Sequence, residues 1–126
     1  MTNEEYQEAV WRFWEAMNND ISRLGGYSFA PDYKYNGKPA TAGETAKGMK
    51  EMLSKYKKYL FTKDELFGEG QKVALRWTLT ATLEDDTVEV STGVNMITFN
   101  AENQVDSNWQ VGPVVVSTTK ATSAAY

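Results

Sequence analysis

The sequence predicts an α+β fold in which three N-terminal helices precede a meander of long antiparallel strands. Two observations predict it. Apolar side chains recur at three- and four-residue spacing in the first part of the chain, as they do on one face of a helix. From residue 61 onward apolar and polar side chains alternate, as they do in strands with one buried face. At 126 residues the chain is one domain, which we place at residues 1–116, with 117–126 as a small, polar and flexible tail.

The first predicted helix starts at Thr2 and Glu5, whose spacing is that of a capping box. "NND" ends this helix, and Asp20 is suited to cap a second, short helix that runs through Ile21 and Leu24 to a Gly-Gly break. The apolar face of the first helix consists of Tyr6, Val10, Phe13, Trp14 and Met17.

The third predicted helix begins at Thr41, whose spacing to Glu44 is again that of a capping box. Its apolar stripe consists of Met49, Leu53, Tyr56 and Leu60. The strands that follow are predicted in "LFTKDELFGEG", in "KVALRWTLTATL" and on both sides of the turn "FNAENQ". In the second of these, one face consists of Val73, Leu75, Trp77, Leu79 and Ala81.

The composition excludes several classes of function. The net charge is -4, and no Lys/Arg cluster forms a phosphate-binding stripe, so we expect no nucleic-acid partner. Without cysteine there is no disulfide or thiolate site, and without histidine any acid-base chemistry falls to Asp, Glu, Tyr or Lys. No apolar run approaches the ~20 residues of a membrane span, and the N-terminal segment is too charged for a signal peptide. We therefore expect a cytoplasmic protein with no membrane partner, and with neither a metal nor a cofactor.

The order of these elements, together with specific segments, resembles the nuclear transport factor 2-like superfamily, and within it the SnoaL-like polyketide cyclases and ketosteroid isomerase-like proteins. The resemblance runs from about residue 4 to 112 and rests on the aromatic first helix ending in "NND", on "FAPDYKYNGKP", on "VALRWTLTATL" and on "VNMITFNAENQVDSNW". It implies a cone-shaped barrel, in which a strongly curved antiparallel mixed sheet and three helices enclose a pocket. It also implies a homodimer through the convex face of the sheet.

Carried over position by position, the resemblance gives an incomplete catalytic set. The base of ketosteroid isomerase falls near Asn36 and Gly37, its tyrosine near Phe13, and its protonated aspartate on Asn95. SnoaL-like cyclases have an aspartate where this chain has Gly112 and Pro113. The resemblance therefore disfavours steroid isomerisation and leaves Asn95 as a hydrogen-bond donor to a developing oxyanion.

The final strand offers the replacement carboxylate, Asp106. Periodicity alone places Asp106, Asn108 and Gln110 toward water, opposite Trp109 and Val111. The resemblance instead turns the three polar side chains into the cone and leaves the apolar ones on the convex face. In that geometry Asp106 is the candidate general base and Asn108 and Gln110 bind the substrate.

Several aromatic side chains complete the predicted site. The resemblance places Tyr33 and Tyr35 near the pocket mouth, where Tyr33 is a candidate acid, although packing in a strand is the commoner role of tyrosine. The remaining candidates for lining the pocket, each of which has ordinary core packing as its alternative, are Phe13, Trp14, Met17, Tyr56 and Trp77. Arg76 alternates away from Trp77, which gives no support to an epoxide-hydrolase arrangement of Arg and Asp.

These observations and the resemblance together lead to one expected function and one alternative. We expect an enzyme of secondary metabolism that binds a hydrophobic polyketide or terpenoid-like molecule and isomerises or cyclises it, or acts as a lyase, without a cofactor. The alternative is a non-catalytic ligand-binding or assembly module of the same fold. An enzyme needs at least one carboxylate inside its pocket, whereas a binding module tolerates a lining of apolar and amide groups.

Overall fold

The computed structural model describes residues 1–20 and 29–120, which form two helices and one sheet of six strands. The elements are α1 (Asn3–Asn19), β1 (Phe29–Tyr35), β2 (Lys38–Pro39), α2 (Ala42–Leu53), β3 (Tyr56–Glu69), β4 (Lys72–Leu83), β5 (Val88–Phe99) and β6 (Val105–Thr119). The strand order is β2-β1-β6-β5-β4-β3, and every neighbouring pair is antiparallel except β1 with β6. The predicted α+β class and mixed sheet are confirmed.

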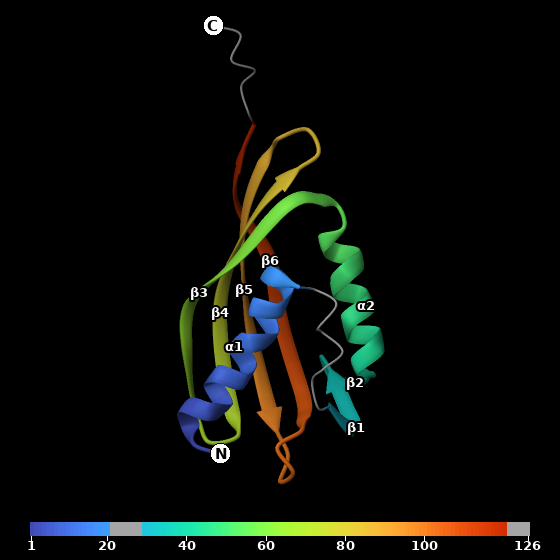
Figure 1. The fold of residues 1–126 in the computed structure, drawn as a ribbon, viewed down its shortest axis with the longest axis vertical. Helices are drawn as coiled ribbons and strands as arrows, with labels where there is room; N and C mark the ends of the chain where they lie inside the picture. Colours follow the sequence, from blue (N-terminus) through green and yellow to red (C-terminus); the bar gives the residue numbers. More distant parts are fainter. Residues whose placement is uncertain (21–28, 121–126) are drawn as a thin grey trace, which may run out of the picture.

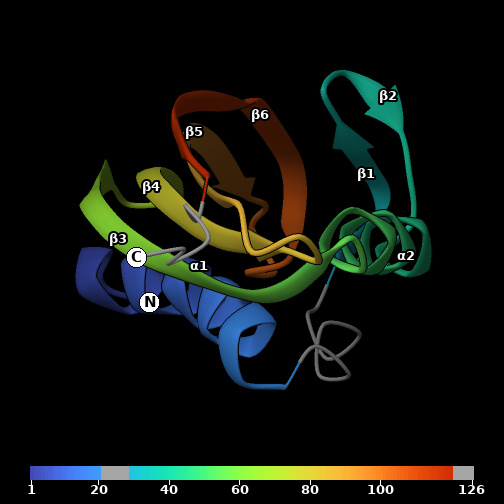
Figure 2. The same cartoon turned by 90° about the horizontal axis from the view of Figure 1, so that it is seen from above.

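The two helices lie at different ends of the curved sheet. α1 crosses the sheet against β3 and β4, and α2 lies beside β1 and β2 (Figure 1). Seen from above, the strands bend around the side on which α1 lies (Figure 2). The predicted cone-shaped barrel is only partly present: the sheet is curved but not closed, because within the described residues β2 and β3 do not pair and remain its two edges. β2 offers only two residues for pairing, and helices rather than a closing strand pair cover the concave face.

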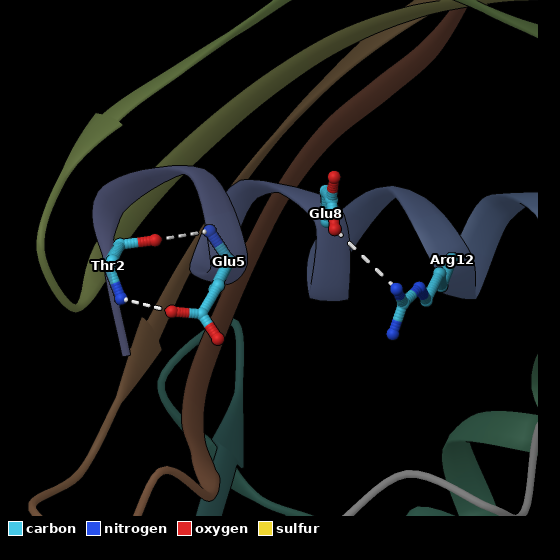
Figure 3. Close-up of polar contacts among 4 residues, drawn as sticks. All are labelled: Thr2, Glu5, Glu8 and Arg12. Carbon is cyan, nitrogen blue, oxygen red and sulfur yellow. Dashed lines mark hydrogen bonds and ion pairs between the residues drawn. The ribbon is translucent and has the colours of Figure 1, made fainter.

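The helix α1 forms as predicted. Thr2 accepts a hydrogen bond from the Glu5 backbone N–H, and the Glu5 carboxylate accepts one from the Thr2 backbone, while Arg12 pairs with Glu8 one turn later (Figure 3). The helix ends before Asp20. All five residues of the predicted apolar face are buried, so α1 forms one wall of the core.

The end of α1 is also fastened to β3. The Asn18 side-chain amide donates to the Phe61 carbonyl at 2.8 Å and accepts from the Phe61 N–H at 2.7 Å, as a neighbouring strand would. The Tyr59 hydroxyl donates to the carbonyl of Met17 at 2.5 Å. The sequence analysis treated "NND" only as a helix end, whereas Asn18 fixes where the helix meets the sheet.

The second predicted helix, after Asp20, lies outside the described residues. The third corresponds to α2, which is shorter than predicted because it ends at Leu53. Tyr56 and Leu60 belong instead to β3. At its start Thr41 accepts from the Glu44 N–H, but the Glu44 carboxylate accepts from the Thr41 hydroxyl, so only half of the predicted capping box is present.

The strands follow their predicted alternation. The predicted apolar face of β4 is buried throughout, whereas Arg76 lies on the other face and pairs with Glu65. β6 continues to Thr119, so residues 117–119 of the expected tail pair with β5, and residues 121–126 lie outside the described residues. None of the helices in the described residues is long and apolar enough to cross a membrane.

Candidate functional site

A groove of about 340 Å³ lies between α2 and the adjacent strands. This volume is within the range of roughly 300–1,000 Å³ that small-molecule sites occupy. Its described lining residues are Tyr35, Ala40, Glu44, Thr45, Gly48, Met49, Met52 and Gln110. Of the predicted substrate-binding residues, Tyr35 and Gln110 line it. Burial raises the pKa of Tyr35 above its ordinary value, at which a phenol is already protonated at neutral pH.

The interior beneath α1 is nearly filled by side chains. A void of about 10 Å³ remains there, lined in the described residues by Val10, Phe13, Phe29, Ile97, Phe99, Val105 and Asn108. Such a volume holds about one water. Phe13 and Asn108 border this void, whereas Trp14, Met17, Tyr56 and Trp77 line neither hollow and pack in the core. For these four, ordinary core packing is the alternative that the structure supports.

A chain of buried side-chain hydrogen bonds connects this core to the groove. The indole N–H of Trp77 donates to Asn95 Oδ1 at 2.8 Å, and Asn95 is fully buried. Asn95 Nδ2 donates to Asn108 Oδ1 at 2.9 Å and to Gln110 Oε1 at 3.2 Å. Gln110 Nε2 in turn donates to the Gly112 carbonyl at 3.2 Å. Both donor hydrogens of Asn95 are thus taken, so it orients its neighbours rather than offering a free donor to a ligand.

Gly93 makes room for this chain. It lies directly opposite Trp77 in the β4–β5 ladder. A Cβ at Gly93 would lie 2.2 Å from Cζ2 of the Trp77 ring, which is far inside van der Waals contact. The indole therefore packs over the bare backbone of Gly93 and reaches Asn95, two residues farther along the same face of β5.

Tyr33 is buried on β1 with an unsatisfied hydroxyl. The residue is 1% exposed, and its hydroxyl has no hydrogen-bond partner in the part of the chain that the structure describes. Thr45, from the groove, and Asn108, from the void, are the polar side chains beside it, although neither meets hydrogen-bond geometry. Burial raises the pKa of Tyr33, and these two neighbours partly offset the rise. Tyr33 thus neighbours one lining residue of the groove and one of the void, and is itself among the described lining residues of neither.

Asp106 does not lie with Asn108 and Gln110. The β5–β6 pairing jumps from Ser107 to Val105 and leaves Asp106 in a bulge. Its carboxylate accepts a hydrogen bond from the Thr98 hydroxyl at 2.5 Å. Thr98 lies on the convex face, opposite to Asn95, and Asp106 lines neither hollow. The prediction that Asp106 faces the interior is therefore wrong, because the bulge breaks the two-residue alternation on which it depended.

The rest of the last strand lies as the resemblance implied. Asn108 and Gln110 face the concave side, whereas Trp109 and Val111 are exposed on the convex face. The turn with Asn36, where the resemblance places a base, carries no carboxylate, and Asn36 Oδ1 accepts from the Gln110 N–H at 2.7 Å. Within the described residues, no group of three or more acidic side chains is placed to hold a metal ion.

The sequence analysis missed Glu44 and Thr45. Glu44 is the one carboxylate among the described lining residues of the groove. The sequence pattern indicates only a capping role for Glu44 and gives no signal for Thr45. Their role in the groove depends on how α2 is placed against β1 and β6, which no local pattern in the sequence specifies.

Comparison of the sequence with family models and with curated proteins finds no match. Solved structures do match. AclR from Streptomyces galilaeus is 20% identical, with a TM-score of 0.73 over 87% of this chain and 90% of that one. A SnoaL-like polyketide cyclase from Agrobacterium tumefaciens is 12% identical, with a TM-score of 0.72 over 88% and 91%. An LEH-like epoxide hydrolase from Mycobacterium tuberculosis is 14% identical, with a TM-score of 0.64 over 86% and 82%. The chain thus has the nuclear transport factor 2-like fold, the fold shared by SnoaL-like polyketide cyclases and ketosteroid isomerase-like proteins.

Proposed function

We propose that this protein binds a largely apolar small molecule with a carbonyl-type oxygen, of polyketide or terpenoid type, and isomerises or cyclises it without a cofactor. The groove beside α2 supplies the binding volume, and its lining combines Met49 and Met52 with a few polar groups. This combination is typical of small-molecule sites. The likeness to a SnoaL-like polyketide cyclase supports the fold-level part of the proposal.

The observation that carries the proposal is the unpartnered hydroxyl of Tyr33. A buried polar group without a partner destabilises a fold by about 1–3 kcal/mol, so its retention is best explained by a use. A phenol is protonated at neutral pH at its ordinary pKa, and the raised pKa of Tyr33 leaves this unchanged. Tyr33 is therefore the proposed acid, which donates its proton to a carbonyl oxygen as an enol forms.

Glu44 is the proposed base in place of Asp106. It lines the groove beside Thr45, which in turn neighbours Tyr33. Tyr33 itself is not among the described lining residues and lies behind Thr45. An acid behind the lining and a base on it can together move a proton between carbon and oxygen, and each typically contributes about 10²–10⁴-fold to the rate.

The test uses β-tetralone, a bicyclic ketone whose protons next to the carbonyl exchange through an enol. The protein is incubated with this ketone in D₂O, and the loss of those proton signals is followed by NMR. We expect faster exchange than in buffer, and a loss of roughly hundredfold in Tyr33→Phe and Glu44→Gln. Tyr59→Phe is the matched control, because its hydroxyl bonds to the Met17 backbone, away from the groove.

A non-catalytic binding module is the second candidate. It is favoured by the interior void, whose described lining contains an amide and apolar groups but no carboxylate. Binding of β-tetralone without exchange above buffer would select this candidate and reject the enzyme. If β-tetralone neither binds nor exchanges, both candidates fail.

We also propose that two copies associate through the convex face of the sheet. Exposed apolar side chains gather there on β5 and β6: Val94, Met96, Trp109, Val111 and Val114. Trp109 alone is 54% exposed, and contiguous apolar patches of this kind mark interaction surfaces. Sedimentation analysis should give a dimer that Trp109→Lys converts to a monomer, while Leu60→Lys, on the edge strand β3, leaves the dimer intact. A wild-type monomer contradicts the proposal.

A further inference from the structure

We propose that Trp77 and Asn95 fix the hydrogen-bonding polarity of the groove, so that it selects ligands whose polar atom accepts a hydrogen bond. The inference rests on the groove being the ligand site, as proposed above. It is carried by the direction of the buried hydrogen bonds that run from Trp77 to Gly112.

The chain of hydrogen bonds starts at a group that can only donate. The indole nitrogen of Trp77 has an N–H and no acceptor. Because it bonds to the Asn95 side chain at 2.8 Å, the atom it meets must be the amide oxygen. The orientation of the Asn95 amide is therefore set by chemistry, since turning it over would place two donors against each other.

The orientation of the Asn95 amide sets the orientation of the two amide side chains that it contacts on β6. With its oxygen on Trp77, its NH₂ group faces Asn108 and Gln110, which must both present oxygen atoms to it. The NH₂ groups of these two side chains consequently turn away from Asn95. Asn95 is fully buried, so no bulk water can relax this requirement.

The chain of hydrogen bonds ends at a group that can only accept. One hydrogen of Gln110 Nε2 goes to the Gly112 carbonyl. Both ends of the chain therefore require the same orientation of the Gln110 amide. Within the described residues the second hydrogen of Nε2 makes no hydrogen bond to another side chain, and Gln110 lines the groove. A ligand that meets this N–H must accept.

Trp77 and Asn95 act here as positioning residues, since neither lines the groove. Gln110 is the residue that contacts the ligand. This division predicts that a change at buried Asn95 alters which ligands bind, even though Asn95 touches none of them.

Three tricyclic probes of nearly the same shape test the polarity. 9-Fluorenone carries only an acceptor, carbazole carries only an N–H donor, and fluorene carries neither. Binding is measured by NMR titration, with the Gln110 side-chain NH₂ signal as the reporter. The wild-type protein should bind 9-fluorenone about tenfold more tightly than carbazole, the factor expected for one hydrogen bond gained or lost.

Asn95→Asp reverses the requirement without changing the shape of the side chain. In its ionised form, which the three facing donors favour, the carboxylate accepts from Trp77 and from both β6 amides, and binding is measured on the alkaline side of its titration. A charge-assisted bond is roughly twice as strong as a neutral one. Gln110 therefore turns its NH₂ group toward the new carboxylate and loses its hydrogen bond to the Gly112 carbonyl. The groove then presents an oxygen, and carbazole should bind more tightly than 9-fluorenone.

Gln110→Glu gives a second route to the same reversal if the buried charge prevents Asn95→Asp from folding, because Gln110 is only partly buried. Gln71→Glu, in the exposed β3–β4 turn, adds the same charge elsewhere and should keep the wild-type preference. Equal binding of all three probes to the wild type, or an unchanged preference in the folded variants, overturns the inference. Exchange of β-tetralone is a separate measurement, so it can succeed while the polarity inference fails.

Discussion

Replacing Tyr33 with phenylalanine is expected to stabilise the fold while removing the proposed acid. The change deletes one oxygen atom that is buried without a partner in the described residues, and leaves the ring packed on Phe29 at a centroid distance of 4.5 Å. An unsatisfied buried hydroxyl costs about 1–3 kcal/mol, so the free energy of unfolding should rise by about that amount. For a domain of this size 1 kcal/mol shifts the Tm by roughly 3–6 °C.

Urea unfolding followed by circular dichroism measures the change, and Tyr59→Phe is the matched control. The Tyr59 hydroxyl donates to the Met17 carbonyl at 2.5 Å, so its removal should lower the free energy of unfolding by about 0.5–1.5 kcal/mol. The two Tyr-to-Phe changes are thus expected to have opposite signs. If Tyr33→Phe destabilises the protein as Tyr59→Phe does, the Tyr33 hydroxyl has a partner in the folded state, and the reasoning that makes it a proton donor is refuted.

Three further changes follow from the same contacts. Gly93→Ala should lower the free energy of unfolding by about 1–3 kcal/mol or more, because the added Cβ would lie 2.2 Å from the Trp77 ring. Urea unfolding measures this change, and the NMR signal of the Trp77 indole N–H reports whether its hydrogen bond to Asn95 is lost. Asp106→Asn should leave exchange of β-tetralone at the wild-type rate, since this side chain bonds to Thr98 on the convex face; a large loss of exchange contradicts that orientation. Burial raises the pKa of Tyr33 in the folded state. Ionisation of Tyr33 therefore leaves the free energy of unfolding unchanged below the unfolded pKa of about 10, and lowers it as the pH rises from there through the folded pKa. Tyr33→Phe should therefore lose less stability than the wild type in alkaline urea titrations, and equal losses would argue against a raised pKa.

The helix α1 could be predicted from the sequence because its signals are local. Its capping box and apolar face depend on residues within a few positions of each other, and both are present in the structure. The same holds for the alternation of β4. What the local pattern could not give is the way in which Asn18 pairs with the backbone of Phe61, 43 residues away.

The junction of α2 and β3 shows how a periodic pattern can mislead. Met49, Leu53, Tyr56 and Leu60 fit a helical spacing, yet only the first two lie on α2. Tyr56, Tyr59 and Phe61 belong to a segment rich in aromatic residues, which favour strands. In β3 this segment pairs with β4 over its whole length. That pairing outweighs the helical spacing, which only Tyr56 and Leu60 continue beyond Leu53.

The polar residues of the last strand divide according to one irregular position. Periodicity alone places Asn108 and Gln110 toward water, and the resemblance places them on the concave side, where they lie with Asn95 because β5 and β6 pair regularly between them. Asp106 is the unpaired residue of a bulge, and a single extra residue turns a side chain to the other face of a sheet. The carboxylate expected inside is therefore outside, and the proton chemistry proposed here moves to Glu44, which lines the groove from α2, and to Tyr33 on β1, which neighbours Thr45 of that lining. The amide chain from Trp77 fixes only the direction of hydrogen bonds and cannot itself take up a proton. The proposed catalysis therefore depends on those two side chains, and their replacement decides between an enzyme and a binding module.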